Sequence, residues 1–341
     1  NTNNAKEIKG ISSVEDYLKI QPNGEYIVLN NLELSGKDSE YRFGTSNFGF
    51  NGVIDFNGHT ITVHTAKHNN AQPLFYIIEE KGTIKNLVLD YYVDDFNNFN
   101  AINGLFSTNY GTLDNIQINL KESSNIERAS VALFGSTNYG IINNFVINSE
   151  KSLIGSRRLT LGVITNYGTM KNGYAYGENI KAIYGVSNQN RDVGVICISN
   201  LGTIKNIYSL VNVETEGTIN SNNIANVISN NNQSGQARNI YSVGYGTKDE
   251  AINGPTIYNV ANTQMIENIF YFADIVYNNT NNQKSTLLAL WDNNFQNSVL
   301  NSENSFNVDE LISNGYYPQI NMPSCMPIQP YIELPKVEDK D

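Results

Sequence analysis

The stretch Asn109-Tyr-Gly-Thr-Leu-Asp-Asn-Ile116 decides the fold, because it returns as Asn138-Tyr-Gly-Ile-Ile-Asn-Asn-Phe145 and as Asn166-Tyr-Gly-Thr-Met-Lys-Asn-Gly173. The second Asn of this stretch recurs along most of the chain, with steps of 29, 29, 29, 28, 34, 33 and 29 residues, at Asn57, Asn86, Asn115, Asn144, Asn172, Asn206, Asn239 and Asn268. A repeat of this length indicates stacked units, each of which buries its apolar side against the next.

The apolar residues of each unit predict strands. They form short runs of branched side chains interrupted by Gly and Asn, and a second apolar pair, such as Leu105-Phe106 or Leu133-Phe134, precedes the Asn-x-Gly turn. No run keeps a helical period over the roughly ten residues that a helical solenoid needs. The sequence therefore predicts an all-β fold, a right-handed single-stranded parallel β-helix with about eight coils of roughly 29 residues.

The recurring asparagines are predicted to be structural corners. Stacking places equivalent residues about 4.8 Å apart, so an Asn at one corner can hydrogen-bond to the coils above and below. Asn also tolerates the left-handed backbone conformation that a sharp corner needs. The predicted structural ladder consists of Asn86, Asn115, Asn144, Asn172, Asn206, Asn239 and Asn268. The longer steps predict surface insertions within residues 174–192 and 211–236.

Three parts of the chain are expected. Residues 1–35 form an N-terminal cap, in which Ser12-Ser-Val-Glu15 has the form of a capping box before a short helix and residues 24–29 read as a strand. Residues 36–284 form the parallel β-helix. Residues 285–341 lose the period, contain short helical or irregular cap segments at 287–291 and 308–312, and end in a Pro-rich linker to a following domain. The polar start, without a signal peptide, indicates a processed piece of a longer protein.

Charge and composition reduce the range of possible binding partners. The net charge of −11 argues against nucleic acid, whose binding depends on cationic contacts to phosphate. No window approaches 18 consecutive apolar residues, so no membrane insertion is expected. Cys197 and Cys325 lie in unrelated contexts and predict no disulfide framework, with Cys197 a buried thiol in a strand. These features favour an extracellular-type module.

Several segments resemble a known family. Tyr26–Ser35, Phe50-Asn-Gly-Val-Ile-Asp-Phe-Asn-Gly-His-Thr-Ile61, Pro73–Phe75 and Gly82-Thr-Ile-Lys-Asn-Leu87 are similar to the N-terminal region of the Gram-positive zinc metallopeptidases that cleave immunoglobulin A1. Gly315-Tyr-Tyr-Pro-Gln-Ile320, Met326–Gln329 and Ile332–Pro335 resemble the segment that closes that region, so the likeness covers nearly the whole chain.

The resemblance implies a non-catalytic β-helical module of a secreted or cell-wall-anchored bacterial protease. Such a module would be extracellular, would position the protease domain and would help recognise the substrate. The implied partners are immunoglobulin A1, as host protein substrate, and the catalytic domain of the same chain. The zinc cofactor is expected in that separate domain, which would make the parent protein a zinc metalloendopeptidase.

The family's zinc motif, His-Glu-x-x-His, is absent from this chain. The nearest arrangement, His64-Thr-Ala-Lys-His68, lacks the Glu that would act as general base. Together with His59, these two residues are all the histidines of the chain. We therefore expect no catalytic residue, no metal site and no cofactor here, and a solvated surface position for the histidines.

A polysaccharide lyase or hydrolase is a further, least favoured interpretation. It would need clustered carboxylates, or a basic residue beside a calcium site, on one strand face. The candidates stand in three loops, Asp90, Asp94 and Asp95 in the first, Arg157 and Arg158 in the second, Arg191 and Asp192 in the third. No pair of them repeats at one corner of neighbouring coils, which argues against this chemistry.

A binding module is the stronger alternative. Tyr110, Tyr139 and Tyr167 occupy the same Asn-Tyr-Gly corner of three consecutive coils, so they are predicted to form a stacked strip that would contact a protein or glycan if exposed. In the simpler interpretation each Tyr only packs across its own turn. The runner-up function is accordingly a surface adhesin-type protein- or glycan-binding β-helix with no protease attached.

Overall fold

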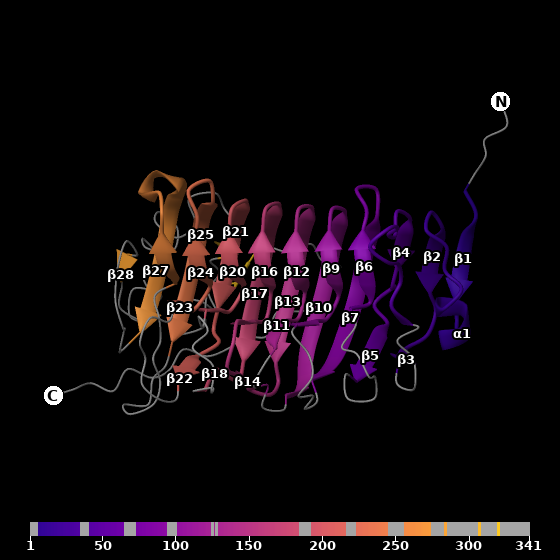
Figure 1. Ribbon diagram of the computed structural model, residues 1–341, viewed down its shortest axis with the longest axis horizontal. Helices are drawn as coiled ribbons and strands as arrows, with labels where there is room; N and C mark the ends of the chain where they lie inside the picture. Colours follow the sequence, from indigo (N-terminus) through magenta and orange to yellow (C-terminus); the bar gives the residue numbers. More distant parts are fainter. Residues whose placement is uncertain are drawn as a thin grey trace.

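The computed structural model describes residues 6–34, 41–64, 73–93, 101–123, 126, 129–183, 192–215, 223–244, 256–273, 283–284, 306–307 and 319–320. In these residues the chain is an all-β parallel β-solenoid of about seven turns with a repeat of about 29 residues and almost no helix (Figure 1). The predicted fold class is confirmed, with about one turn fewer than the eight expected coils. Successive coils follow one another along the long axis of the molecule.

The longest sheet runs from one end of the solenoid to the other (Figure 1). Its strands, all parallel, are β1 (Ile8–Ile11), β2 (Glu25–Val28), β4 (Val53–Asp55), β7 (Thr83–Val93), β10 (Thr112–Ser123), β13 (Ile141–Ser149), β17 (Thr169–Gly177), β21 (Thr203–Ser209), β25 (Gln236–Gly244), β27 (Ile266–Ala273) and β28 (Gln283–Lys284), joined at its side by β3 (Leu32–Leu34) and β5 (Thr60–His64).

Three further parallel sheets close the coils within the described residues. The second contains β6 (Phe75–Ile78), β9 (Phe106–Asn109), β12 (Gly135–Asn138), β16 (Val163–Asn166), β20 (Cys197–Asn200), β24 (Ile228–Asn231) and β26 (Ile257–Val260). The third contains β8 (Ala101–Asn103), β11 (Ser130–Ala132), β15 (Leu159–Thr160), β19 (Asp192–Gly194) and β23 (Asn223–Ala225). The smallest contains β14 (Leu153–Gly155), β18 (Ile180–Ala182) and β22 (Val213–Thr215). Two of its strands, β18 and β22, lie within the stretches where the longer sequence steps predict insertions.

All eight recurring asparagines have left-handed backbone conformations, with φ between 52° and 58°. Asn57 lies between β4 and β5, and each of the other seven divides a strand of the long sheet into a short leg and a long leg. Asp114 pairs with Asn143 and Ile116 pairs with Phe145, so the corner residues drop out of the register. Most of their side chains form the expected ladder, as in Asn115 Nδ2 to Asn86 Oδ1 at 2.8 Å.

The ladder changes partners in the middle of the solenoid. Asn144 donates to Asp114 Oδ1 at 3.0 Å, and Asn172 donates to Asn143 Oδ1 at 2.9 Å, so the residue just before the corner supplies the acceptor. At the N-terminal end Asn86 donates to Asp55, which lies two positions before the corner Asn57. An acidic or amide side chain one or two positions before the corner therefore competes with the corner Asn as acceptor.

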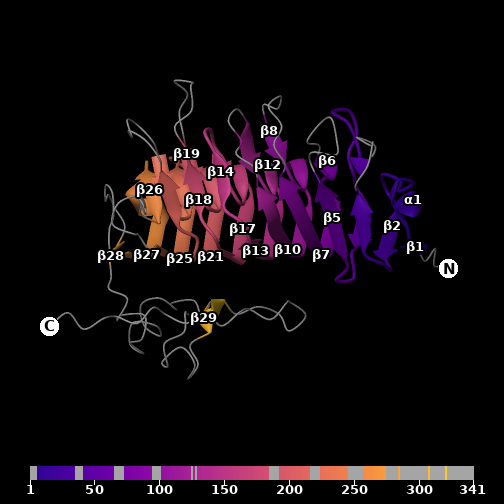
Figure 2. The same cartoon turned by 90° about the horizontal axis from the view of Figure 1, so that it is seen from below.

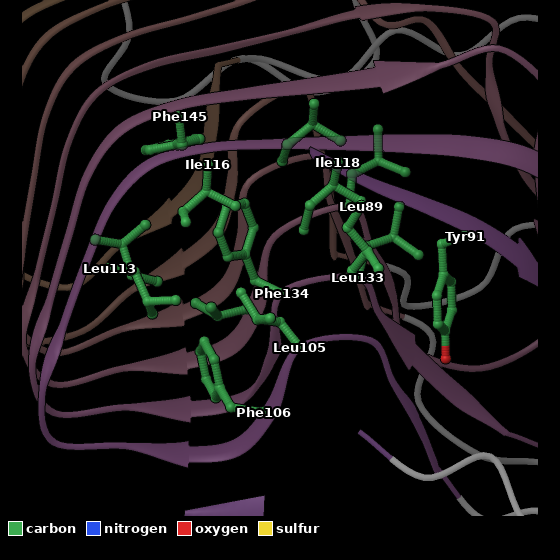
Figure 3. Packing of buried hydrophobic residues seen from close by; sticks show 14 of the residues in the cluster. Leu89, Tyr91, Leu105, Phe106, Leu113, Ile116, Ile118, Leu133, Phe134 and Phe145 are labelled. Atoms are coloured by element: carbon green, nitrogen blue, oxygen red, sulfur yellow. The ribbon is translucent and has the colours of Figure 1, made fainter. Parts of the chain in front are cut away.

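The interior of each coil is filled by inward-pointing aliphatic and aromatic side chains. Figure 3 shows Leu113, Ile116 and Ile118 of β10 facing Phe106, the first residue of β9, and the preceding Leu105. Large and small residues alternate where needed: a Cβ on Gly173 would clash with the ring of Phe145, its register partner in the preceding coil. The continuous apolar core gives the stack its stability.

The N-terminal cap contains the predicted helix and strand. The helix is α1 (Val14–Tyr17), and its N-cap is Ser13, whose side chain accepts from the backbone N–H of Asp16 at 3.1 Å. The capping box is therefore shifted by one residue from the predicted Ser12–Glu15 pair, because Asp16 also accepts from the backbone N–H of Ser12 at 3.0 Å. Strand β2 pairs with β1 and β4 and so extends the long sheet at its entrance.

Two short strands near the C-terminus, β29 (Phe306–Asn307) and β30 (Gln319–Ile320), pair antiparallel. They lie beside the long sheet, where β30 contacts β17 and the ring of Phe306 lies 5.5 Å from that of Tyr241 (Figure 2). The cap segments predicted at 287–291 and 308–312, and the Pro-rich linker, lie outside the described residues. A single turn of 3₁₀ helix, η2 (Thr263–Met265), precedes β27.

Candidate functional site

The three tyrosines predicted to form a strip are exposed and stacked on one another. Tyr110, Tyr139 and Tyr167 are 43%, 46% and 46% exposed. Their ring centroids are separated by 4.9 Å and 4.8 Å, with interplanar angles of 8° and 6°. The spacing equals that of neighbouring strands, so the rings form an offset parallel stack along the solenoid axis. We call these three residues the exposed tyrosine strip.

A buried row of asparagines lies next to the strip and holds its corners in place. In the second sheet Asn109 donates to Asn138 Oδ1 at 2.8 Å, and Asn138 donates to Asn166 Oδ1 at 2.8 Å. The same contact continues through Asn166, Asn200 and Asn231, and all five side chains are at most 1% exposed. We call this set the inner ladder.

Four of the inner-ladder side chains, Asn109, Asn138, Asn166 and Asn231, also hydrogen-bond to their own turns. Asn109 Oδ1 accepts from the N–H of Gly111, and its Nδ2 donates to the Gly111 carbonyl. The N–H groups of Tyr139 and Gly140 both donate to the Asn109 carbonyl, at 2.7 and 3.0 Å. A Cβ on Gly140 would clash with the carbonyl oxygen of Gly111, which explains the Gly of the Asn-x-Gly motif. The strip is therefore held rigidly before any partner arrives.

The sequence pattern predicts Asn-x-Gly only as a turn, and the inner ladder is seen only in the structure. The available signal was the recurrence of Asn immediately before the Tyr in consecutive repeats. Recurrence alone does not distinguish a solvated turn Asn from a buried one, because both stand at the same corner.

The strip borders a narrow outer surface made by the short legs of the long-sheet strands. We define this short face as residues 112–114, 141–143, 169–171, 203–205 and 236–238, whose middle residues point into the core. The outer positions carry two columns: Thr112, Ile141 and Thr169 lie in one, with Ile141 42% exposed. Asp114, Asn143 and Lys171 lie in the other.

The histidines lie apart from the strip. His59 Nδ1 is 3.2 Å from Asn31 Oδ1. His64 stacks on Tyr92 with ring centroids 4.0 Å apart, and its Nε2 lies 3.9 Å from Glu33 Oε1. His68 is outside the described residues. In the part of the chain that the structure describes, no three His, Cys, Asp or Glu side chains gather where they could hold a metal ion.

The residues weighed for polysaccharide chemistry are only partly described. Asp90 accepts from Asn119 at 2.8 Å, whereas Asp94, Asp95 and Arg191 lie outside the described residues. Asp192 has its pKa raised, mainly by burial, while the hydrogen bond from Asn223 and the charge of Arg158 act in the opposite direction. Among the described candidates, Arg158 and Asp192 lie on neighbouring coils and form a single pair that is not repeated at the same corner of other coils.

The remaining singled-out residues are buried or undescribed. Cys197 is fully buried, and burial raises the pKa of its thiol to about 12. Cys325 lies outside the described residues. No helix in the described part of the chain has the length and apolar character to cross a membrane.

Comparison with known proteins identifies no relative. No protein-family model matches the chain. A search of curated proteins likewise finds no match. The structure establishes the fold of the chain, a parallel β-solenoid, and these comparisons establish no family.

Proposed function

We propose that this chain is a non-catalytic contact module, which binds a partner protein through the exposed tyrosine strip. The observation that carries the proposal is the strip itself: three aromatic rings in register, 43–46% exposed, on a backbone fixed by the inner ladder. Aromatic side chains anchor interfaces because they bury much area while ordering few torsions. A rigid strip loses little entropy on binding.

The segments quoted above favour a parent protein of the zinc metallopeptidase type, secreted or attached to a bacterial cell wall and acting on immunoglobulin A1. In that setting the solenoid positions the protease domain and helps recognise the substrate. The partner of the strip is then either the immunoglobulin or the catalytic domain of the same chain. The absence of His-Glu-x-x-His from the sequence agrees with a catalytic centre elsewhere.

The test is the binding of a Tyr139→Ala variant to immunoglobulin A1 and to the separately produced catalytic domain. We expect truncation of the central ring to weaken binding by roughly tenfold or more, as for an interface hot spot. The matched control is Phe48→Ala, because Phe48 is 48% exposed and lies at the N-terminal end. Unchanged binding by Tyr139→Ala, or equal losses in both variants, would remove the strip as the contact site.

The adhesin-type alternative predicts a different binding result in the same experiment. An adhesin would bind a host protein or glycan through the strip with no dependence on a protease domain. Binding to a host surface that Tyr139→Ala abolishes, combined with no affinity for any metallopeptidase domain, would favour that alternative.

A further inference from the structure

The outer column of the short face changes character along the solenoid. From the N-terminal side its register partners are Asp55, Lys85, Asp114 and Asn143. It continues through Lys171, Lys205 and Arg238 and ends at Glu267. The first part alternates in sign, and Lys85 Nζ lies 3.8 Å from Asp55 Oδ2. The later part places three cations on consecutive strands. We call Lys171, Lys205 and Arg238 the basic column.

Adjacent strands are about 4.8 Å apart, so the basic column brings like charges together. Like charges directly opposite each other in a sheet are destabilising. Elsewhere the solenoid avoids this cost: Lys121 pairs with Glu150 of the next coil at 2.7 Å. Within the described part of the chain, Lys171 and Lys205 have neither an ion pair nor a hydrogen bond from their ammonium groups. All three residues of the basic column are partly exposed, but the Nε atom of Arg238 is buried and Arg238 takes part in an interaction of its own, so Lys171 and Lys205 are the available cations.

The basic column and the tyrosine strip share one surface. Tyr167 and Lys171 belong to the same coil and border the same short leg, with Thr169 between them. The strip covers this coil and the two before it, and the basic column covers this coil and the two after it. A ligand lying along the solenoid axis would therefore meet aromatic edges first and cations next.

The stacked tyrosines also favour electron-rich groups. Their faces are occupied by one another, so between the two ends of the strip they present ring edges and hydroxyl groups to solvent. Ring edges carry the positive part of the aromatic quadrupole and hydroxyls can donate, so both suit carboxylates and carbonyl oxygens. A sugar that stacks on an aromatic face finds such a face only at the ends of the strip. The surface thus fits a polypeptide better than a glycan.

From these observations we infer that the short face binds an acidic polypeptide segment, whose carboxylates lie against the basic column and whose neighbouring residues lie on the tyrosine strip. The inference rests on the proposed function and specifies its partner. Two electrostatic effects then act on the ligand in opposite directions. The basic column attracts its carboxylates locally, whereas the net charge of −11 repels an acidic ligand at long range.

The sign of the salt dependence separates the two effects. A labelled glutamate peptide bound at the basic column loses affinity as salt rises, because screening weakens the local attraction. Contact governed by the overall negative charge would instead strengthen as salt screens the repulsion. We expect affinity to fall with salt. No binding, or affinity that rises with salt, would overturn the inference.

The variant test combines Lys171→Gln and Lys205→Gln. We expect roughly a fivefold or greater loss of glutamate-peptide affinity, as for two lost charge contacts. The control, Lys9→Gln with Lys151→Gln, changes the net charge equally at exposed positions away from the short face. Melting temperatures of both double variants verify folding. An equal loss in the control would show a general charge effect and contradict a site.

A uronic acid polysaccharide serves as the second probe. Binding of this probe through the basic column, with no binding of the glutamate peptide, would overturn the polypeptide assignment. Failure here is distinguishable from failure of the proposed function: if Tyr139→Ala abolishes partner binding while the basic-column variant binds the partner normally, the strip remains the contact site and the acidic-ligand inference falls.

Discussion

The exposed tyrosine strip and a second tyrosine stack in the same molecule have nearly the same ring geometry but opposite environments. Tyr174 and Tyr208 stack at 4.8 Å, and Tyr208 and Tyr241 stack at 5.1 Å, each pair almost parallel. These three residues, the buried tyrosine column, are at most 2% exposed, whereas the strip is 43–46% exposed. Both sets arise from one residue type repeated at one position of consecutive coils.

The difference comes from what lies over each stack. The buried tyrosine column is on the outer side of the long sheet, opposite to inward-facing Ile207 and Ile240. There β29 and β30 approach, with the Phe306 ring 5.5 Å from Tyr241 and β30 in contact with β17 (Figure 2). The strip stands at a corner beside the short face. Repetition therefore sets the stacking, and distant chain segments set the exposure.

The largest effect should appear when one ring of each stack is truncated. Tyr208→Ala removes a buried ring and leaves a cavity, so we expect unfolding to become easier by about 3–5 kcal/mol. Tyr139→Ala removes an exposed ring and should cost less than about 1 kcal/mol. Urea denaturation of both variants measures the contrast. Similar losses at the two sites would show that the strip is a packing element and not a free surface.

The support beneath the strip can be tested at Asn138. Asn138→Leu removes the hydrogen bonds that Asn138 makes to Asn109 Nδ2 and Asn166 Oδ1 of the neighbouring coils, and each buried hydrogen-bonding position left unsatisfied costs about 1–3 kcal/mol. We expect a clear fall in the denaturation midpoint and a weaker partner contact. Asn47→Leu, at an exposed turn position, is the comparison and should change stability little. A stable Asn138→Leu variant would mean that the strip does not depend on the inner ladder.

Alkaline pH should act on the buried tyrosine column. Burial raises the pKa of Tyr174 and Tyr208 above the usual 10.0. Above about pH 10 the unfolded chain loses these phenol protons while the native column keeps them. The contribution of each phenol to the free energy of unfolding is therefore fully present below that pH, and above it the free energy of unfolding falls by about 1.4 kcal/mol per pH unit for each such phenol. Urea midpoints across this range measure the slope. Tyr208→Phe removes one phenol and should flatten it; an unchanged slope would assign the effect to other tyrosines.

Much of the fold could be predicted because it follows from local rules repeated along the chain. Asn at a sharp corner is favoured by its tolerance of positive φ, and all eight such positions were readable from their spacing. The capping box was placed one residue early, since Ser12 and Ser13 are both acceptable N-caps and only the hydrogen bond to Asp16 selects between them. The acceptors Asp114 and Asn143 were not predicted, because side-chain pairing across coils depends on rotamers.

The sequence by itself determined the period, the corners and the alignment of like residues into columns, including Tyr110, Tyr139 and Tyr167. These properties depend on short-range backbone preferences and on the regular spacing of stacked strands. The tertiary structure alone decided which columns face water. It exposed the strip and the basic column, buried the inner ladder, and brought Phe306 to the buried tyrosine column. The physical reason is that burial is a property of contacts between segments distant in sequence, which no repeat encodes.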